Sequence, residues 1–399
     1  MNLEDGRQLT YCTNVHPGES AADVLRVLDT DVPAVRDALG FKASFGVGLR
    51  VSDAASRDLS TPQGLAQLRD VLDRHEAYVF TINGFPYGTF HGAPVKDQVH
   101  RPDWTEPERP AYLIRLARLL AALSPPGAEG SISTSPLGYR AHHSDPHRAM
   151  SEAARALADV AASLVELEAE TGQRIHVDLE PEPDGLLETL AQARSFFVDT
   201  LFREGRDHLM RQSGIRAEEA ERRLRRHLGV CLDVCHAAVV FESLDDGLAG
   251  LRAEAIEVGK IQLSSALEAR WRDVHEAQAV ARALTPFDEP VYLHQVAMQM
   301  PSGAPRRFTD LEPALAALSA GDGEGMLRTH FHVPLFEDDY GALSSTQSAV
   351  REVLERLRRG LACRHLEVET YTWGVLPNPP VGGLHASIAR ELAWVLESR

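Results

Sequence analysis

The chain has 399 residues, 44% of them hydrophobic and 25% charged, with a formal net charge of −17. This is the composition of a globular protein with a large core, and the acidic balance argues against nucleic acid or an anionic membrane as a partner. Four cysteines are too few for a disulfide scaffold. Without a signal-peptide core or a run of 18 apolar residues, we expect a cytoplasmic protein with no membrane span.

Short β-rich runs alternate with amphipathic segments along nearly the whole chain. Helices are predicted near 21–39, 63–75, 109–123, 149–171 and 346–359. The repeated alternation of predicted strands and helices favours parallel strands with right-handed crossovers. No G-x-G-x-x-G motif follows a predicted strand, which argues against a dinucleotide-binding sheet. We therefore predict one α/β domain over 1–399, a (β/α)8 TIM barrel. Strands are predicted at 9–16, 43–51, 78–85, 130–137, 174–180, 228–235, 260–265, 291–296, 326–333 and 365–371.

Ten strand candidates exceed the eight of a barrel by two. We assign the 291–296 run, with a possible neighbour, to an insertion at roughly 267–325 between the last barrel strands. The segment at roughly 187–227 is richer in helix than a barrel needs, and we expect two extra helices packed on the outside.

Polar residues capable of chemistry follow many of these strands. The carboxyl ends of barrel strands meet at one face, so these side chains are expected to line a common mouth. Three runs carry the strongest signal, because each delivers carboxylate or imidazole at its end: 175–180, 231–236 and 365–373. The candidates in chain order are His16, Asn83, Tyr87, Lys96, Arg101, Glu180, Glu182, Asp233, His236, Gln262, His294, His332, Glu367 and Glu369.

Mixed carboxylate and imidazole sets suit divalent ions of the Mn²⁺, Fe²⁺, Co²⁺ or Zn²⁺ type. Such an ion can polarise a carbonyl and an adjacent hydroxyl together, and carboxylates that are not ligands can then move protons. This is the chemistry of aldose–ketose isomerisation and of epimerisation beside a carbonyl.

Several of these residues have an ordinary structural interpretation as well. A lone histidine such as His294 is more often a hydrogen-bonded core or loop residue than a ligand. Glu367 and Glu369 face the same side of their strand, which is either a solvated edge or the barrel lumen, and burial between helices favours the lumen. Lys96 and Arg101 are either surface charges or the binders of a substrate phosphate or carboxylate.

At these residues the sequence resembles the xylose-isomerase-like TIM-barrel superfamily of sugar and sugar-phosphate isomerases and epimerases. The resemblance implies a divalent ion (Mn, Zn, Co or Mg) held by Glu180, by Asp233 of an Asp-x-x-His motif with His236, and by Glu369 or Glu367. The seventh strand departs from the pattern, because Gln262 stands where histidine is usual. An amide oxygen is a weaker, uncharged ligand, and His332 or His294 are the alternatives.

A closer resemblance, over nearly the whole chain, is to Ebo-type metabolite traffic proteins. The segments that carry it are YCTNVHPGE (11–19), TINGFPYG (81–88), LEPEP (179–183), GKIQLSS (259–265), YLHQ (292–295), HFHVP (330–334) and LEVETYTW (366–373). It implies the barrel, a small sugar- or cyclitol-like ligand, a role in secondary-metabolite biosynthesis or traffic, and possible partners encoded in the same gene cluster. It does not imply a particular reaction.

Two hypotheses of function remain open. In the first, the protein is a metal-dependent isomerase or epimerase of a sugar or cyclitol phosphate, with Glu180, Glu369 and His236 catalytic and Glu180, Asp233, Gln262, Glu369 and His332 around the metal. In the second, it is a non-catalytic carrier. A metal-dependent endonuclease would need a basic groove, which the acidic balance disfavours. Expected substrate-binding residues are His16, Asn83, Tyr87, Lys96, Arg101, Glu182, His294 and Glu367.

Overall fold

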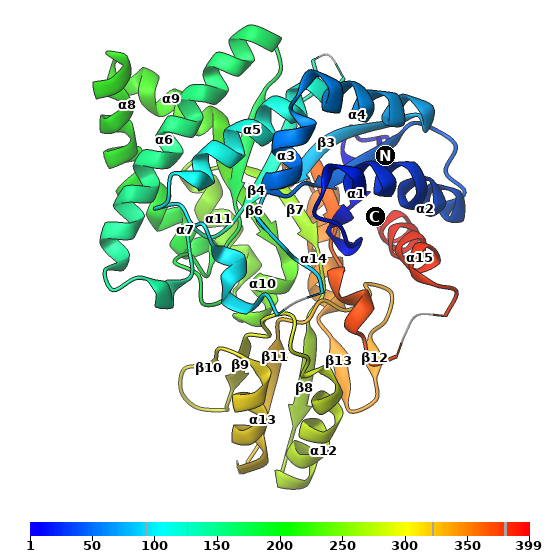
Figure 1. Ribbon diagram of the computed structural model, residues 1–399. Coiled ribbons are helices and arrows are strands. Elements are labelled where there is room, and N and C mark those ends of the chain that lie inside the picture. The colour runs from blue at the N-terminus through cyan, green and yellow to red at the C-terminus, as the bar shows by residue number, and fades with distance from the viewer. Residues whose placement is uncertain (93, 126, 321–322, 379–380) are drawn as a thin grey trace.

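The computed structural model describes residues 1–92, 94–125, 127–320, 323–378 and 381–399. Its larger sheet has eight parallel strands in the order β1-β14-β7-β6-β5-β4-β3-β2. Helices surround this sheet (Figure 1), and the predicted barrel is confirmed. The strands are β1 (Gln8–Tyr11), β2 (Phe45–Arg50), β3 (Ala77–Asn83), β4 (Gly130–Thr134), β5 (Ile175–Leu179), β6 (Leu228–Asp233), β7 (Val258–Leu263) and β14 (His365–Val368).

The barrel closes between its first two strands with the help of a side chain. Cys12 and Gly48 form a parallel bridge, and the Thr10 hydroxyl donates to the Gly46 carbonyl at 2.8 Å and accepts from the Gly48 amide at 3.1 Å. A side chain at Gly48 would collide with the Glu367 carboxylate. Glycine at this position therefore leaves room for a charged group inside the barrel.

The helices outside the barrel follow local sequence signals. For example, α6 begins after Asp145, whose side chain accepts from the Arg148 amide, and ends at Gly172 with a φ of 73°. Outside the insertion the helices are α1 (Ala21–Arg26), α2 (Val32–Leu39), α3 (Asp53–Leu59), α4 (Pro62–Arg74), α5 (Glu108–Leu123), α6 (Pro146–Thr171), α7 (Leu190–Phe196), α8 (Arg206–Ser213), α9 (Ala217–His227), α10 (Val234–Val239), α11 (Leu244–Ala253), α14 (Gln347–Arg358) and α15 (Leu384–Glu397).

Shorter helical turns complete the chain. Two are π-helical and continue their neighbours, η2 (Val27–Asp31) and η5 (Phe197–Gly205). The second joins α7 to α8 as one helical stretch before α9, within the segment near 187–227. The 3₁₀ turns are η1 (Thr13–Val15), η3 (Lys96–His100), η4 (Arg140–His142), η6 (Thr285–Phe287) and η7 (Tyr371–Val375). Among the described helices, none is both long and apolar enough to cross a membrane.

A second sheet lies between the seventh and eighth barrel strands in the sequence, at one end of the barrel (Figure 1). Its antiparallel order is β10-β9-β11-β8-β13-β12, and it has its own apolar core, which includes Trp271, Leu327 and Phe331. The elements are β8 (Leu267–Trp271), α12 (Val274–Leu284), β9 (Val296–Gln299), β10 (Arg306–Phe308), α13 (Leu311–Ala320), β11 (Gly325–Thr329), β12 (Asp339–Tyr340) and β13 (Leu343–Ser345).

Two strand predictions change in this region. Residues 291–295 form no strand, and the strand begins only at Val296, because the preceding segment turns around Glu289, whose carboxylate accepts from the amides of Val291 and Tyr292. The run predicted at 326–333 is β11 in the antiparallel sheet and ends at Thr329. The insertion predicted at roughly 267–325 thus covers β8 to β10, while β11 to β13 carry the second sheet on to Ser345.

Candidate metal and substrate site

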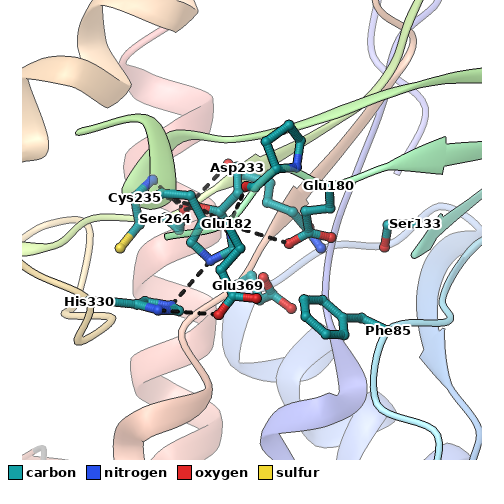
Figure 2. A network of polar contacts seen from close by, with 12 residues as sticks. Phe85, Ser133, Glu180, Glu182, Asp233, Cys235, Ser264, His330 and Glu369 are labelled. Carbon is teal, nitrogen blue, oxygen red and sulfur yellow. Dashed lines mark hydrogen bonds and ion pairs between the residues drawn. The ribbon is translucent and has the colours of Figure 1, made fainter. Parts of the chain in front are cut away.

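Three buried carboxylates meet at the carboxyl ends of the barrel strands. Glu180 directly follows β5, Asp233 is the last residue of β6, and Glu369 directly follows β14. One oxygen from each lies within 4.8 Å of the other two. Figure 2 shows the three side chains gathered in one place, with Ser264 and His330 beside them. A single ion with oxygen ligands can bridge this spacing.

Burial and mutual repulsion perturb these acids. Burial, and then the charges of Glu369 and Asp233, raise the pKa of Glu180 well above its usual value. Burial, and then Asp233 and Glu367, raise the pKa of Glu369 in the same way. Neighbouring Glu182 is also buried, which raises its pKa to about 8. Without a compensating cation, the site therefore favours protonated carboxyls.

Hydrogen bonds fix the orientation of two of the three carboxylates. The side-chain amides of Asn14 and Asn83 donate to the same oxygen of Glu369, at 2.8 and 2.7 Å. The Ser264 hydroxyl and the backbone amide of His236 each donate to Asp233 Oδ1 at 2.8 Å. The second of these bonds caps α10, so the Asp-x-x-His spacing is the geometry of a helix start.

Unpartnered polar atoms in the same place indicate that a cation fits. Glu180 Oε2, Asp233 Oδ2 and both polar atoms of the Gln262 amide are buried without a hydrogen-bond partner in the described part of the chain. Gln262 is in register with Asp233 on the neighbouring strand. Such atoms are rare in native proteins and need an explanation. A divalent ion held by Glu180, Asp233 and Glu369 would satisfy the two carboxylate oxygens, whereas in the Gln262 amide only the oxygen can bind a cation.

A narrow cavity lies over the carboxylates. Its solvent-accessible volume is about 60 Å³, which is enough for an ion and a few water molecules. Glu180, Glu182, Glu369, Asn14 and Asn83 contribute its polar wall. The apolar wall comes from the segment after β3 and from the insertion, through Phe85, Pro86, Phe90, Val95, Val99, Tyr292 and Leu293.

Three histidines line the same cavity. His236 is in α10, whereas His330 and His332 follow β11 of the insertion. The Nε2 atom of His330 lies 3.1 Å from that of His236 and 3.3 Å from that of His332. Burial lowers the pKa of all three, to about 4 for His332. The imidazoles are therefore neutral at pH 7 and available as metal ligands.

Two further predicted site residues line the cavity with partners already in place. Glu182 accepts a hydrogen bond from Gln295 at 3.2 Å. The Lys96 ammonium lies 2.6 Å from Asp310 of the insertion. An anionic substrate group would have to compete with Asp310 for this lysine.

The other predicted substrate-binding residues lie away from the cavity or beneath it. His16 contacts the Tyr11 hydroxyl at 3.0 Å, and Tyr87 packs on Tyr112. Arg101 pairs with Glu106 at 2.7 Å, and His294 pairs with Glu289 at 2.8 Å. Glu367 lies in the barrel interior, 2.6 Å from the Lys260 ammonium. None of these five residues is in the cavity lining, so their substrate-binding roles stay predictions.

Sequence reasoning did not single out three residues that the structure places at the site. Asn14 holds Glu369, and its position at the end of the first strand was an available signal. His330 and Tyr371 come within 3.4 Å of each other through their polar atoms. The alternation in His330-Phe-His332 was the visible sign that both histidines share a face.

No protein-family model matches this chain, and no curated protein matches it significantly. Solved structures do match. A xylose isomerase domain protein from Alicyclobacillus acidocaldarius is 16% identical, with 98% of both chains covered and a TM-score of 0.46. A xylose isomerase domain containing protein from Salmonella typhimurium is 14% identical, with 100% of this chain and 98% of that chain covered and a TM-score of 0.44.

A third match is the IOLI protein with a binding zinc atom, at 11% identity, with 98% of this chain and 96% of that chain covered and a TM-score of 0.46. Identities and TM-scores this low assign no function, and the strand order alone establishes the barrel. The resemblance to Ebo-type metabolite traffic proteins stays a prediction.

Proposed function

We propose that the protein binds a divalent cation (Mn, Zn, Co or Mg) through Glu180, Asp233 and Glu369 and isomerises or epimerises a small sugar- or cyclitol-like ligand. The observation that carries this proposal is the convergence of three buried carboxylate oxygens within 4.8 Å at the barrel mouth, beside unpartnered polar atoms. A cluster of acids that raise one another's pKa is a common feature of functional sites.

The ion would polarise a carbonyl and a neighbouring hydroxyl of the ligand. Glu180 and Glu369 belong to strands three positions apart in the sheet, so they approach the cavity from different sides. Burial and neighbouring acids raise the pKa of both carboxyls in the metal-free protein, and a carboxylate beside a bound ligand can move protons. One removes a proton beside the carbonyl and the other returns it. Return to the same carbon gives epimerisation, and return to the neighbouring carbon gives isomerisation.

The cavity wall favours an uncharged polyol over a phosphorylated one. Carboxylates form its floor, and the one lysine of its lining is paired with Asp310. Asn14, Asn83 and the aromatic rings can bind hydroxyls and the apolar face of a sugar ring. The resemblance to Ebo-type proteins suggests a secondary metabolite or its precursor as the ligand and other proteins of the same cluster as partners.

The test is solvent proton exchange with the metal-loaded protein in deuterated water. Neutral ketoses and cyclitol ketones form one panel, and their phosphates form a second. We expect deuterium incorporation from the neutral panel that is lost in both Glu180→Gln and Glu369→Gln. Glu391→Gln is a control, because Glu391 is also a buried acid whose pKa burial raises to about 8, and it is not in the cavity lining. Ligand binding without any exchange would support the carrier hypothesis instead.

A further inference from the structure

The three cavity histidines are held by hydrogen bonds that fix their tautomers. His236 Nδ1 lies 3.0 Å from the Pro181 carbonyl, and His332 Nδ1 contacts the Glu369 carbonyl. His330 Nδ1 lies 2.6 Å from the side-chain oxygen of Gln295. A carbonyl oxygen accepts only, so each Nδ1 carries the proton and each Nε2 presents a lone pair.

Gln295 cannot be flipped to change this assignment. Its side-chain nitrogen donates to Glu182 Oε1 at 3.2 Å and to the Pro183 carbonyl at 3.1 Å. Both partners are acceptors, so the amide nitrogen must face them and the amide oxygen must face His330. The contacts of Gln295 with Glu182 and Pro183 therefore fix the orientation of its amide, and through it the tautomer of His330.

The Nε2 atom of His330 lies close to those of both other histidines. The Nε2 atoms are 3.1 Å apart between His236 and His330 and 3.3 Å apart between His330 and His332. Ring nitrogens of His236 and His332 lie within 4.8 Å of each other. One shared proton could pair two of the nitrogens but not all three. The Tyr371 hydroxyl is 3.4 Å from His330 Nε2, which is too long for a good O–H hydrogen bond.

We propose that His236, His330 and His332 form a second metal site, for a borderline ion of the Zn²⁺, Co²⁺ or Fe²⁺ class, beside the carboxylate site. Ligands 2.0–2.1 Å from a tetrahedral zinc ion are about 3.3 Å apart, and the two Nε2 pairs that include His330 have about this spacing, at 3.1 and 3.3 Å. The bonds from each Nδ1 to an oxygen are the supporting contacts that metal-bound histidines usually make.

The histidine site has an open side and a close relation to the carboxylate site. All three rings line the cavity. One coordination position of the ion would therefore remain open to solvent or to a ligand, as in catalytic zinc sites. Asp233 lies within 4.8 Å of His236 and His332 and also of Glu180 and Glu369. It is the side chain shared by the surroundings of both ions. The proposal does not depend on isomerase activity.

Metal analysis and zinc-edge X-ray absorption test this site. After removal of metals with a chelator, the full-length protein is dialysed against micromolar Zn²⁺. We expect two zinc ions in the wild type and one in His330→Gln and in His332→Gln. In Glu180→Gln/Glu369→Gln we expect one zinc ion, with about three imidazole nitrogens at 2.0–2.1 Å in its spectrum.

His227→Gln is the matched control. His227 is buried and also directs Nδ1 to a carbonyl, that of Ile175 at 2.8 Å, but it is outside the cavity lining, so this variant should keep both ions. Zinc content unchanged by His330→Gln and His332→Gln, or an oxygen-only spectrum, would overturn the histidine site and leave the carboxylate site standing. If a variant fails to fold, imidazole scattering in the wild type decides, since its absence also overturns the proposal.

Discussion

The Lys260 ammonium lies 2.6 Å from the Glu367 carboxylate, and both side chains are fully buried inside the barrel. Burial opposes the charge of Lys260, but Glu367 outweighs it and raises the lysine pKa. Glu367, on the same face of its strand as Glu369, is not in the cavity lining.

Removing one partner of this pair should be costly. We expect Lys260→Met to lower the free energy of unfolding by about 3–5 kcal/mol, because it leaves a buried charge uncompensated. Lys260→Met/Glu367→Gln should lose less than the single variant. Urea denaturation of the four proteins of the double-mutant cycle measures the coupling. If the losses of the two single variants add up to the loss of the double variant, the pair is not coupled.

Divalent cations should stabilise the wild-type fold through the carboxylate site. An ion that binds only the folded state, present at 100 times its dissociation constant, adds about 2.7 kcal/mol. We expect thermal melting to show this rise with Mn²⁺, and we expect Asp233→Asn and Glu369→Gln to abolish it. Glu391→Gln should behave as the wild type. A rise that survives in Asp233→Asn would place the stabilising ion elsewhere.

The metal-free protein should become less stable as the pH rises. Glu180, Glu182 and Glu369 have raised pKa values in the fold, so the folded state binds more protons than the unfolded chain. The free energy of unfolding should therefore fall as the pH rises above about 4.5, where glutamates of the unfolded chain titrate. For Glu182 the fall continues to pH about 8, which is the pKa of this residue in the fold. In Glu182→Gln the fall should be shallower. Melting temperatures of the wild type and of Glu182→Gln, recorded with a chelator from pH 5 to 8, measure this difference. The same dependence on pH in both proteins would contradict the prediction.

Asn14 and Asn83 should tune metal affinity through Glu369. Both donate to the same carboxylate oxygen, and loss of such a supporting contact typically weakens metal binding about 10–100-fold. We expect Asn83→Ala and Asn14→Ala to raise the Mn²⁺ dissociation constant within that range in calorimetric titrations. Unchanged affinity in both variants would indicate that Glu369 is not a ligand.

Much of the barrel could be predicted, because hydrophobic strands and amphipathic helices alternate with local periodicity. The strand ends that carry Glu180, Asp233 and Glu369 were visible for the same reason. Parallel strands deliver their carboxyl ends to one face, so three residues far apart in sequence were expected together, and the structure places them within 4.8 Å.

The full extent of the insertion and its contacts with the barrel could not be predicted from the sequence, because these contacts are non-local. Asp310 of the insertion pairs with Lys96 of the loop after β3, which removes a cation that seemed free for an anionic substrate. His332 was expected near the metal, but the contact of His330 with His236 joins the second sheet to the barrel, and no local pattern predicts it. Residues 291–296 have strand-like composition, but a turn around Glu289 occupies their first part.

Anomalous diffraction from crystals soaked in Mn²⁺ tests the central claim most directly. If the barrel mouth is a carboxylate metal site, a manganese peak should appear within about 2.0–2.6 Å of oxygens from Glu180, Asp233 and Glu369, and it should be absent from Asp233→Asn crystals. A fully occupied peak elsewhere, or no peak at millimolar Mn²⁺ with all three side chains as described, would contradict the account.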